Sequence, residues 1–220
     1  MNAQVAVAPD GSPVDVYRAL PVEPEFRPVL ESVKPPASVL DLGCGVGRLA
    51  NDLVQRGFTV TGVDESRSML KHLNPDVEAI ESRIDQLRLD RRFDIVVLAS
   101  HFVNIADPAE AQSFLTAIAD HVLPGGAVFV EHYDRMLSDT AAKVGEVHVE
   151  FRVLEVRGNE FDGRVTYALD DRFWPQAFTA RLLDDEALRA ALTEAGLRFR
   201  SRLSSSWLVA EPDLAGATNV

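Results

Sequence analysis

The sequence is poor in cysteine, in basic residues and in long hydrophobic runs, and each shortage excludes a class of protein. Its one cysteine, Cys44, excludes an internal disulfide and a cysteine-based metal cluster within one chain. The 22 lysines and arginines are outnumbered by 34 aspartates and glutamates, and the resulting net charge of -12 disfavours nucleic acid and anionic membranes as partners. No apolar run approaches the ~20 residues that span a bilayer, and the first residues lack the basic and apolar segments of a signal peptide. We therefore expect a cytoplasmic protein without a metal, a nucleic-acid partner or a membrane partner.

The size and composition of the chain fit one domain. It has 220 residues, of which 46% are hydrophobic, an ordinary share for a globule that buries its own core. The sequence contains no internal repeat and no low-complexity block. We expect a single domain over residues 1–220.

One stretch, residues 39–50, organises the rest of the chain and reads Val-Leu-Asp-Leu-Gly-Cys-Gly-Val-Gly-Arg-Leu-Ala. Residues 38–42 are apolar enough for a buried parallel strand, and three alternating glycines, Gly43, Gly45 and Gly47, follow it. Glycines let a ligand touch bare backbone, and the N–H groups that open the next helix have no partners within the helix. A strand, a glycine loop and a helix in this order are typical of nucleotide binding.

The spacing of the loop distinguishes two kinds of nucleotide site. A dinucleotide-binding dehydrogenase carries G-x-G-x-x-G, whereas this loop runs G-x-G-x-G and has Arg48 where the third glycine would be. Asp41 precedes the first glycine by two residues, and together with the loop it resembles motif I of the class I S-adenosylmethionine-dependent methyltransferases. A second predicted strand, residues 58–63, ends in Asp64 at the ~20-residue offset where an acid accepts both ribose hydroxyls, which strengthens the resemblance.

The resemblance implies S-adenosyl-L-methionine as the cofactor. In that family the glycine loop holds the methionine end, the acid after the second strand holds the ribose, and the next residue covers the base. The cofactor-binding residues implied in this chain are Tyr17, Asp41, Gly43, Cys44, Gly45, Asp64, Glu65, Arg83, Ile84, Ala99 and Ser100.

Four of these positions have other interpretations or depart from the family. Asp64 could instead cap the helix that begins near Ser66, and Tyr17, on a predicted lid helix, could simply pack its ring against the sheet. Many relatives carry an acid and a small residue where this chain has Arg83 and Ile84. We therefore expect the backbone N–H of Ile84 to recognise the base.

The fold implied is α/β, a Rossmann-like doubly wound seven-stranded sheet whose last strand is antiparallel, with a small antiparallel β cap inserted after the fifth strand. Hydrophobic periodicity fits this order: residues 93–99 read as a central strand buried on both faces, and alternation from about residue 147 predicts a meander. The expected parts are N-terminal lid helices (1–34), a cofactor-binding core (35–145), the β cap (146–183), a C-terminal helix and strands (184–210) and a tail (211–220).

Two histidines are the candidate catalytic bases. His101 follows the predicted fourth strand and His132 the fifth, and ligands of doubly wound sheets gather at these strand ends. Imidazole accepts protons near neutral pH, which suits methyl transfer to a hydroxyl. Alternatively, His101 could only contact the cofactor or Asn104, and His132 could cap the sheet end and orient Tyr133.

The same strand ends and the predicted cap supply candidate substrate contacts. These are Phe102, Asn104, Tyr133 and Trp174, although aromatic residues at strand spacing are at least as often ordinary core. A catechol-type metal site is not matched by the spacing of the acids. The Asn/Asp-Pro-Pro-Tyr motif of methyltransferases that act on nucleic-acid bases is also missing.

We therefore expect methyl transfer to an oxygen or nitrogen of a small metabolite. One alternative is a protein or RNA methyltransferase, which would need a basic groove around Arg83, Arg88, Arg91 and Arg92. Another is a non-catalytic S-adenosylmethionine-binding module, since loss of catalysis would leave the loop intact. A homodimer, the acceptor and the methylated atom are left open.

Overall fold

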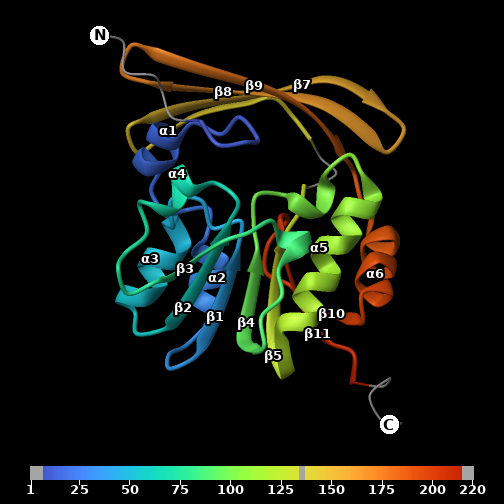
Figure 1. The fold of residues 1–220 in the computed structure, drawn as a ribbon. Helices are drawn as coiled ribbons and strands as arrows, with labels where there is room; N and C mark the ends of the chain where they lie inside the picture. Colours follow the sequence, from blue (N-terminus) through green and yellow to red (C-terminus); the bar gives the residue numbers. More distant parts are fainter. Residues whose placement is uncertain (1–6, 134–136, 215–220) are drawn as a thin grey trace.

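The computed structural model describes residues 7–133 and 137–214, and its centre is a seven-stranded sheet (Figure 1). The order of the strands across this sheet is β10-β11-β5-β4-β1-β2-β3. The strands are β1 (Ser38–Leu42), β2 (Thr59–Asp64), β3 (Glu78–Glu81), β4 (Phe93–Leu98), β5 (Val122–Glu131), β10 (Leu197–Arg202) and β11 (Trp207–Pro212). Neighbouring strands from β3 to β5 are parallel, and β11 is antiparallel to both β5 and β10. The predicted Rossmann-like sheet with an antiparallel last strand is confirmed.

Helices cover both faces of the sheet. Leu40 and Leu42 of β1 face a core shared with α5 and α6, whereas Val39 faces a second core shared with α2 and α3. This alternation follows from the two-residue period of a strand, and it explains why the central strands are apolar throughout. The helices are α1 (Val14–Ala19), α2 (Arg27–Ser32), α3 (Arg48–Gln55), α4 (Arg67–Leu70), α5 (Pro108–His121) and α6 (Asp185–Glu194), with 3-10 turns η1 (Ile84–Gln86) and η2 (Phe102–Asn104).

A second, antiparallel sheet lies across the end of the first, above α1 and the loops that follow the parallel strands (Figure 1). It contains β6 (Thr140–Val144), β7 (Val147–Arg157), β8 (Glu160–Leu169) and β9 (Arg172–Arg181), in that order. The predicted β cap is therefore present after the fifth strand. We call this four-stranded sheet the cap.

The cap begins earlier than the sequence predicts. Its first strand, β6, starts at Thr140 rather than at residue 146, so the sheet has four strands where the alternation predicted three. β6 is an edge strand whose first four side chains are exposed, and its sequence Thr-Ala-Ala-Lys-Val has no apolar alternation to detect.

The N-terminal segment also differs in detail. The sequence predicts a second helix over about residues 23–33 that Pro28 should bend or restart, and α2 spans only Arg27–Ser32. Pro28 lies in its first turn, where the missing N–H of proline has no partner to lose. The proline therefore starts this helix instead of bending a longer one.

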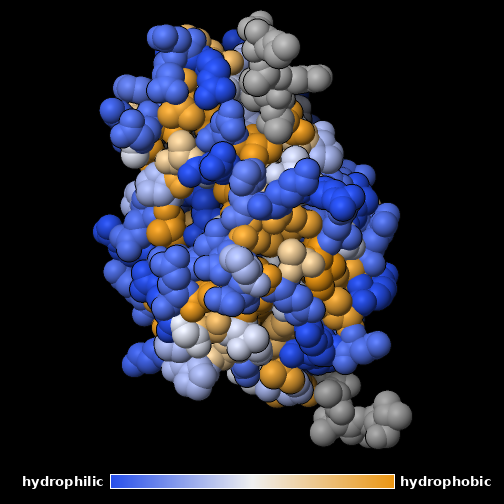
Figure 2. Space-filling view, turned by 60° about the vertical axis from the view of Figure 1, so that its left-hand side comes forward, coloured by the Kyte–Doolittle hydropathy of each residue, from blue (hydrophilic) through white to orange (hydrophobic). Residues whose placement is uncertain are grey.

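The surface mixes hydrophobic and hydrophilic residues. In Figure 2, hydrophobic side chains gather in the middle of the visible face with hydrophilic ones around them. Large exposed hydrophobic side chains include Leu154, Val156 and Phe173 of the cap. None of the helices in the described part of the chain is long and apolar enough to cross a membrane.

Candidate active site

The glycine loop between β1 and α3 is bent back onto β2. The backbone nitrogens of Gly43 and Cys44 donate to the carbonyl oxygen of Val63 at 2.8 and 2.9 Å. Gly43 and Gly45 have φ of 70° and 56°, a conformation that glycine adopts without steric cost. A Cβ added at Gly45 would meet nothing within 4 Å, so the backbone at this point borders open space. This is the arrangement that a loop holding a ligand by its backbone requires.

Asp64, at the end of β2, is hydrogen-bonded to that loop. One carboxylate oxygen accepts a hydrogen bond from the backbone nitrogen of Gly45 at 2.8 Å, and the other accepts from Ser66 at 2.8 Å. Burial raises the pKa of Asp64, and the two backbone donors oppose that shift. The alternative in which Asp64 caps the next helix is not needed, since the Ser66 side chain itself accepts from the nitrogen of Met69 at the start of α4.

Asp41 and Cys44 lie deeper in the site. Asp41 is buried in β1 between Gly62 and Val97, and burial together with the negative charge of Asp64 raises its pKa to about 7. The Cys44 thiol packs against β2, where a Cβ added to Gly62 would come within 2.9 Å of the sulfur. Burial also raises the pKa of this thiol well above its usual value, so it is an unreactive packing group.

The residues predicted to surround the base lie side by side beyond β2 and β3. The Arg83 guanidinium bonds Asp85 at 3.0 Å and Glu110 at 2.9 Å, and it lies 3.7 Å from the carboxylate of Glu65. Ile84 is buried at the start of η1. The structure thus brings Glu65, Arg83 and Ile84 together, with the arginine occupied by acids.

The turn after β4 is strained. Ser100 and His101 have φ of 56° and 55°, and a left-handed conformation costs a residue with a Cβ roughly 1–2 kcal/mol. Ala99, before them, is buried, whereas Ser100 is exposed. Two adjacent strained residues of this kind are typical of functional sites.

A buried glutamate that the sequence analysis did not select holds this turn. Glu131, the last residue of β5, accepts a hydrogen bond from the backbone nitrogen of Ser100 at 2.7 Å, and the backbone N–H of His101 is near enough to oppose the rise of its pKa. Burial and the nearby Glu25 raise the pKa of Glu131 to about 8. Its signal in the sequence is an acid that directly ends the apolar run of residues 127–130.

His101 is held in a buried position beside Tyr133. Its ring stacks on that of Tyr133 with centroids 3.9 Å apart, and its Nδ1 is buried without a hydrogen-bond partner among the described residues. Burial, with a smaller contribution from His132, lowers the pKa of His101 to about 3. The imidazole is therefore neutral near pH 7 and available for a hydrogen bond, but so low a pKa makes it a weak base.

His132 has a different surrounding from the one expected of a base. Its Nδ1 lies 2.9 Å from the carbonyl oxygen of Tyr133, and its Nε2 lies 2.8 Å from a guanidinium nitrogen of Arg202. Since a guanidinium only donates, Nε2 accepts and Nδ1 donates, which fixes a neutral tautomer. Arg202 in turn pairs with Asp185 of α6. This arrangement corrects the expectation of a second base and favours the alternative in which His132 caps the end of the sheet.

Asn104 joins the core to the cap instead of facing a ligand. It is fully buried; its Nδ2 donates to the carbonyl oxygen of Arg181 at 2.7 Å, and its Oδ1 accepts from the nitrogen of Tyr133 at 3.0 Å. The Arg181 side chain returns the contact by donating to Ile105 and Val103. The predicted substrate contact is therefore a structural tie between β9 and the turns after β4 and β5.

Aromatic rings fill the space between cap and core. Tyr133 lies within 6.3 Å of Phe151, Phe161 and Phe178 of the cap, measured between ring centroids. Trp174 is half-buried on β9 and pairs with Tyr167 of β8. Tyr133, which follows β5, thus packs against the aromatic rings of the cap, and Trp174 belongs to the cap itself.

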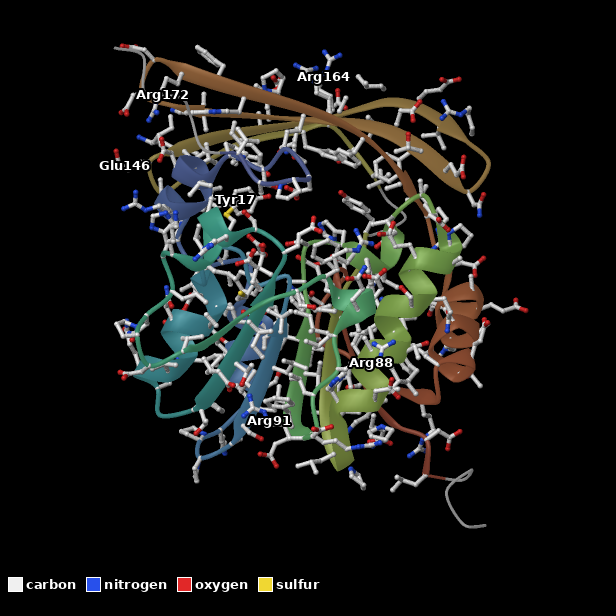
Figure 3. All side chains as sticks on the ribbon, in the orientation of Figure 1. Tyr17, Arg88, Arg91, Glu146, Arg164 and Arg172 are labelled. Atoms are coloured by element: carbon white, nitrogen blue, oxygen red, sulfur yellow. The ribbon has the colours of Figure 1, made fainter. Side chains whose placement is uncertain are left out.

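Phe102 and Tyr17 border the glycine loop from two sides. A Cβ added to Gly43 would come within 2.4 Å of the Phe102 ring, so the two are in close contact. Tyr17 of α1 packs near Val46 and Met69, and its hydroxyl lies 3.5 Å from that of Tyr167 (Figure 3). The short helix α1 therefore bridges the loop and the cap.

Apart from Arg83, the arginines of the proposed basic groove lie elsewhere. Figure 3 shows Arg88 and Arg91 in the lower part of the molecule, away from Tyr17 and the cap. Arg88 donates to the carbonyl oxygen of Leu87 at 2.6 Å, Arg91 pairs with Glu78, and Arg92 donates to Val122 at 3.2 Å. Among the described residues, no group of three or more His, Cys, Asp or Glu is arranged to hold a metal.

Comparisons with known proteins agree with this geometry. Residues 39–126 match the family described as "Methyltransferase domain", a range that runs from β1 into β5. The resemblance drawn from the glycine loop to class I S-adenosylmethionine-dependent methyltransferases is confirmed for this part of the chain.

The chain aligns with only part of each named relative. The chain is 39% identical over 103 residues to a cypemycin N-terminal methyltransferase of Streptomyces sp., which is 44% of this chain and 42% of that protein. It is 32% identical over 122 residues to a ubiquinone biosynthesis O-methyltransferase of Caulobacter vibrioides, which is 51% of this chain and 47% of that protein. The chain thus spans less than half the length of these curated relatives.

Solved structures share nearly the whole architecture. The sugar N-methyltransferase KedS8 from Streptoalloteichus sp. has a TM-score of 0.66 at 20% identity, covering 96% of both chains. At this identity the similarity concerns the fold, including the core and the cap together.

Proposed function

We propose that this chain, whose residues 39–126 form a methyltransferase domain, transfers a methyl group from S-adenosylmethionine to a nitrogen or oxygen atom of a small molecule. The observation that carries the proposal is the contact between Asp64 and Gly45, which places a carboxylate beside open glycine backbone at the end of the sheet. A carboxylate there can accept the two adjacent ribose hydroxyls, and the bare backbone can line the methionine end.

The remaining cofactor contacts follow from the positions of the side chains. Glu65 and the buried Ile84 would enclose the adenine, and Tyr17 would close the site from α1. Asp41 and Cys44 would support the loop from below, since both are buried behind it. Ala99 and Ser100 would lie near the methyl group, at the end of the central strand.

The chemistry needs alignment, a water-poor site and, for a hydroxyl acceptor, removal of a proton. S-adenosylmethionine supplies an electrophilic methyl group on a sulfonium. His101 offers a buried, neutral Nδ1 with no protein partner among the described residues, so it can hydrogen-bond an acceptor. To take the proton of an attacking hydroxyl, its pKa would have to rise from about 3 when cofactor and acceptor are bound. Tyr133 fixes the imidazole plane by stacking.

The cap would select the acceptor. Its rings Phe151 and Phe178 pack on Tyr133, which stacks on His101, and aromatic side chains of this kind near the site suit an acceptor with apolar character. The acidic chain and the paired arginines give no support to a nucleic-acid acceptor. A small molecule is the acceptor class that these features favour.

An activity screen tests the proposal. Purified protein with S-adenosylmethionine would be offered panels of small amines and phenols, and formation of S-adenosylhomocysteine would be followed. We expect acceptor-dependent product from at least one panel and none from Asp64→Ala. Cofactor binding without turnover on any acceptor would favour the non-catalytic binding module instead.

A further inference from the structure

We propose that Glu131 is a positioning residue, whose carboxylate holds the Ser100–His101 turn so that the His101 ring faces the acceptor. This inference rests on the proposed function for its catalytic meaning. Its structural part can be measured without any acceptor.

The contact of Glu131 with the turn depends on its place at the end of a strand. Glu131 ends β5, which is the parallel neighbour of β4, and only 5% of its surface is exposed. From there its carboxylate accepts a hydrogen bond from the backbone N–H of Ser100 at 2.7 Å, with the N–H of His101 next to it. The side chain thus satisfies a backbone donor that the turn takes away from the sheet.

The turn needs such an anchor because of its conformation. Both residues are left-handed and neither is glycine, so the free chain would leave this conformation readily. Glycines at these positions would provide a turn without strain. A histidine held in a strained backbone by a buried acid is better explained by a need for its side chain in one place.

The contacts of His101 show where the turn places its ring. Its ring lies against Tyr133 at 3.9 Å, while Nδ1 is buried and lacks a partner among the described residues. A buried nitrogen without a partner is costly, and a ligand that donates an N–H or O–H would satisfy it. If the turn relaxed, this nitrogen would reach water instead.

Charged and titratable groups from several elements face this pair. Glu131 has Glu25 and Arg48 nearby, and Arg48 bonds Glu25 at 2.7 Å, while His101 has His132 and Tyr133. Burial raises the pKa of Glu131 and lowers that of His101. A change at position 131 therefore acts on the titration of His101 through the turn.

Hydrogen exchange of the Ser100 and His101 amides tests the anchor directly. In Glu131→Ala the Ser100 amide should exchange about tenfold faster or more than in the wild type, because it loses its acceptor, and the His101 amide should also exchange faster because the turn relaxes. Glu131→Gln keeps the volume and one acceptor oxygen, so it should fall between the two and remains informative where the alanine variant fails to fold. The matched control is Glu211→Gln on the adjacent strand β11, whose acid pairs with Arg198 and should leave both amides unchanged.

Titration of His101 by NMR separates positioning from mere support of the fold. We expect the wild-type ring to stay neutral through the mildly acidic range and the ring in Glu131→Gln or Glu131→Ala to titrate at a pH at least about one unit higher, since it gains access to water. Unchanged amide exchange and an unchanged His101 titration in a folded variant would overturn the proposal. Calorimetric binding of S-adenosylmethionine, run in parallel, tests the proposed function separately, because the amide and titration results do not depend on it.

Discussion

The carboxylate of Glu131 lies 2.7 Å from the backbone nitrogen of Ser100, and this contact joins the end of β5 to the left-handed turn after β4. In the same turn, the neutral ring of His101 has a buried Nδ1 without a hydrogen-bond partner in the described part of the chain. The carboxyl edge of the sheet therefore has the glycine loop on one side and His101 on the other.

Replacement of His101 should distinguish the two acceptor classes. If the bound acceptor raises the pKa of His101 enough for it to act as the base, His101→Ala should lower kcat for a hydroxyl acceptor by about 10²–10⁴, the usual contribution of a general base. For an amine that arrives unprotonated the loss should be far smaller. The measurement is kcat for one acceptor of each kind, with His148→Gln, on the exposed face of the cap, as the control. Equal, small losses for both classes would remove His101 from the mechanism.

Replacement of Gly45 should separate cofactor binding from folding. Gly45 and Gly158 both have positive φ, 56° and 64°, and an added Cβ meets nothing within 4 Å at either position. Gly45→Ala and Gly158→Ala should therefore each lose roughly 1–2 kcal/mol of stability. Only Gly45→Ala should weaken S-adenosylmethionine binding, because its methyl group would enter the space along the loop. Calorimetry and thermal melts on both variants test this. Equal affinities for S-adenosylmethionine would contradict the proposal that the glycine loop holds the cofactor.

Stability should fall as the pH rises from about 5 to 8. Burial raises the pKa of Asp41 to about 7 and that of Glu131 to about 8, so the fold favours their neutral forms. Stability from such groups is fully present below the unfolded pKa and is lost as the pH rises through the folded pKa. Asp41→Asn should therefore flatten the decline of Tm over this range. Asp94→Asn is the control, since Ser38 lowers the pKa of that acid and its effect lies at lower pH.

Removal of the Asn104 amide should loosen the cap. Asn104→Ala leaves the Arg181 carbonyl and the Tyr133 N–H without partners, at a cost of about 1–3 kcal/mol for each group. Hydrogen exchange in β9 and at Tyr133 should accelerate relative to the parallel strands. Asn74→Ala removes only an exposed contact to Asp76 and should not change this exchange. A variant with normal cap exchange would show that the aromatic layer alone holds the cap.

The central sheet and the cofactor-binding edge are marked by local signals in the sequence. The glycine loop, Asp41 and Asp64 have fixed spacings, and the apolar run at residues 93–99 can only be a buried strand, so the sheet and the cofactor edge could be predicted. The edge strand β6 has no apolar period and was missed. Sequence position alone could not show whether a strand-end side chain faces the cleft.

Side-chain partners explain the remaining differences. His101 and His132 occupy equivalent positions after neighbouring strands, yet Arg202 from a strand 70 residues away engages His132 and leaves His101 as the candidate base. Asn104 is similarly taken by Arg181 of the cap. Glu131 was overlooked because its role depends on the left-handed turn opposite it, which contains no glycine to mark it.

The most direct test of the central claim is calorimetric titration with S-adenosylmethionine and, separately, with NAD. The wild type and the control Asp94→Ala, at the opposite end of the sheet, should bind S-adenosylmethionine with micromolar affinity, and Asp64→Ala should lose about tenfold or more, because hydrogen bonds to a charged group contribute about 1.5–3 kcal/mol. Binding of NAD alone, or of neither ligand by the wild type, would contradict the methyltransferase account.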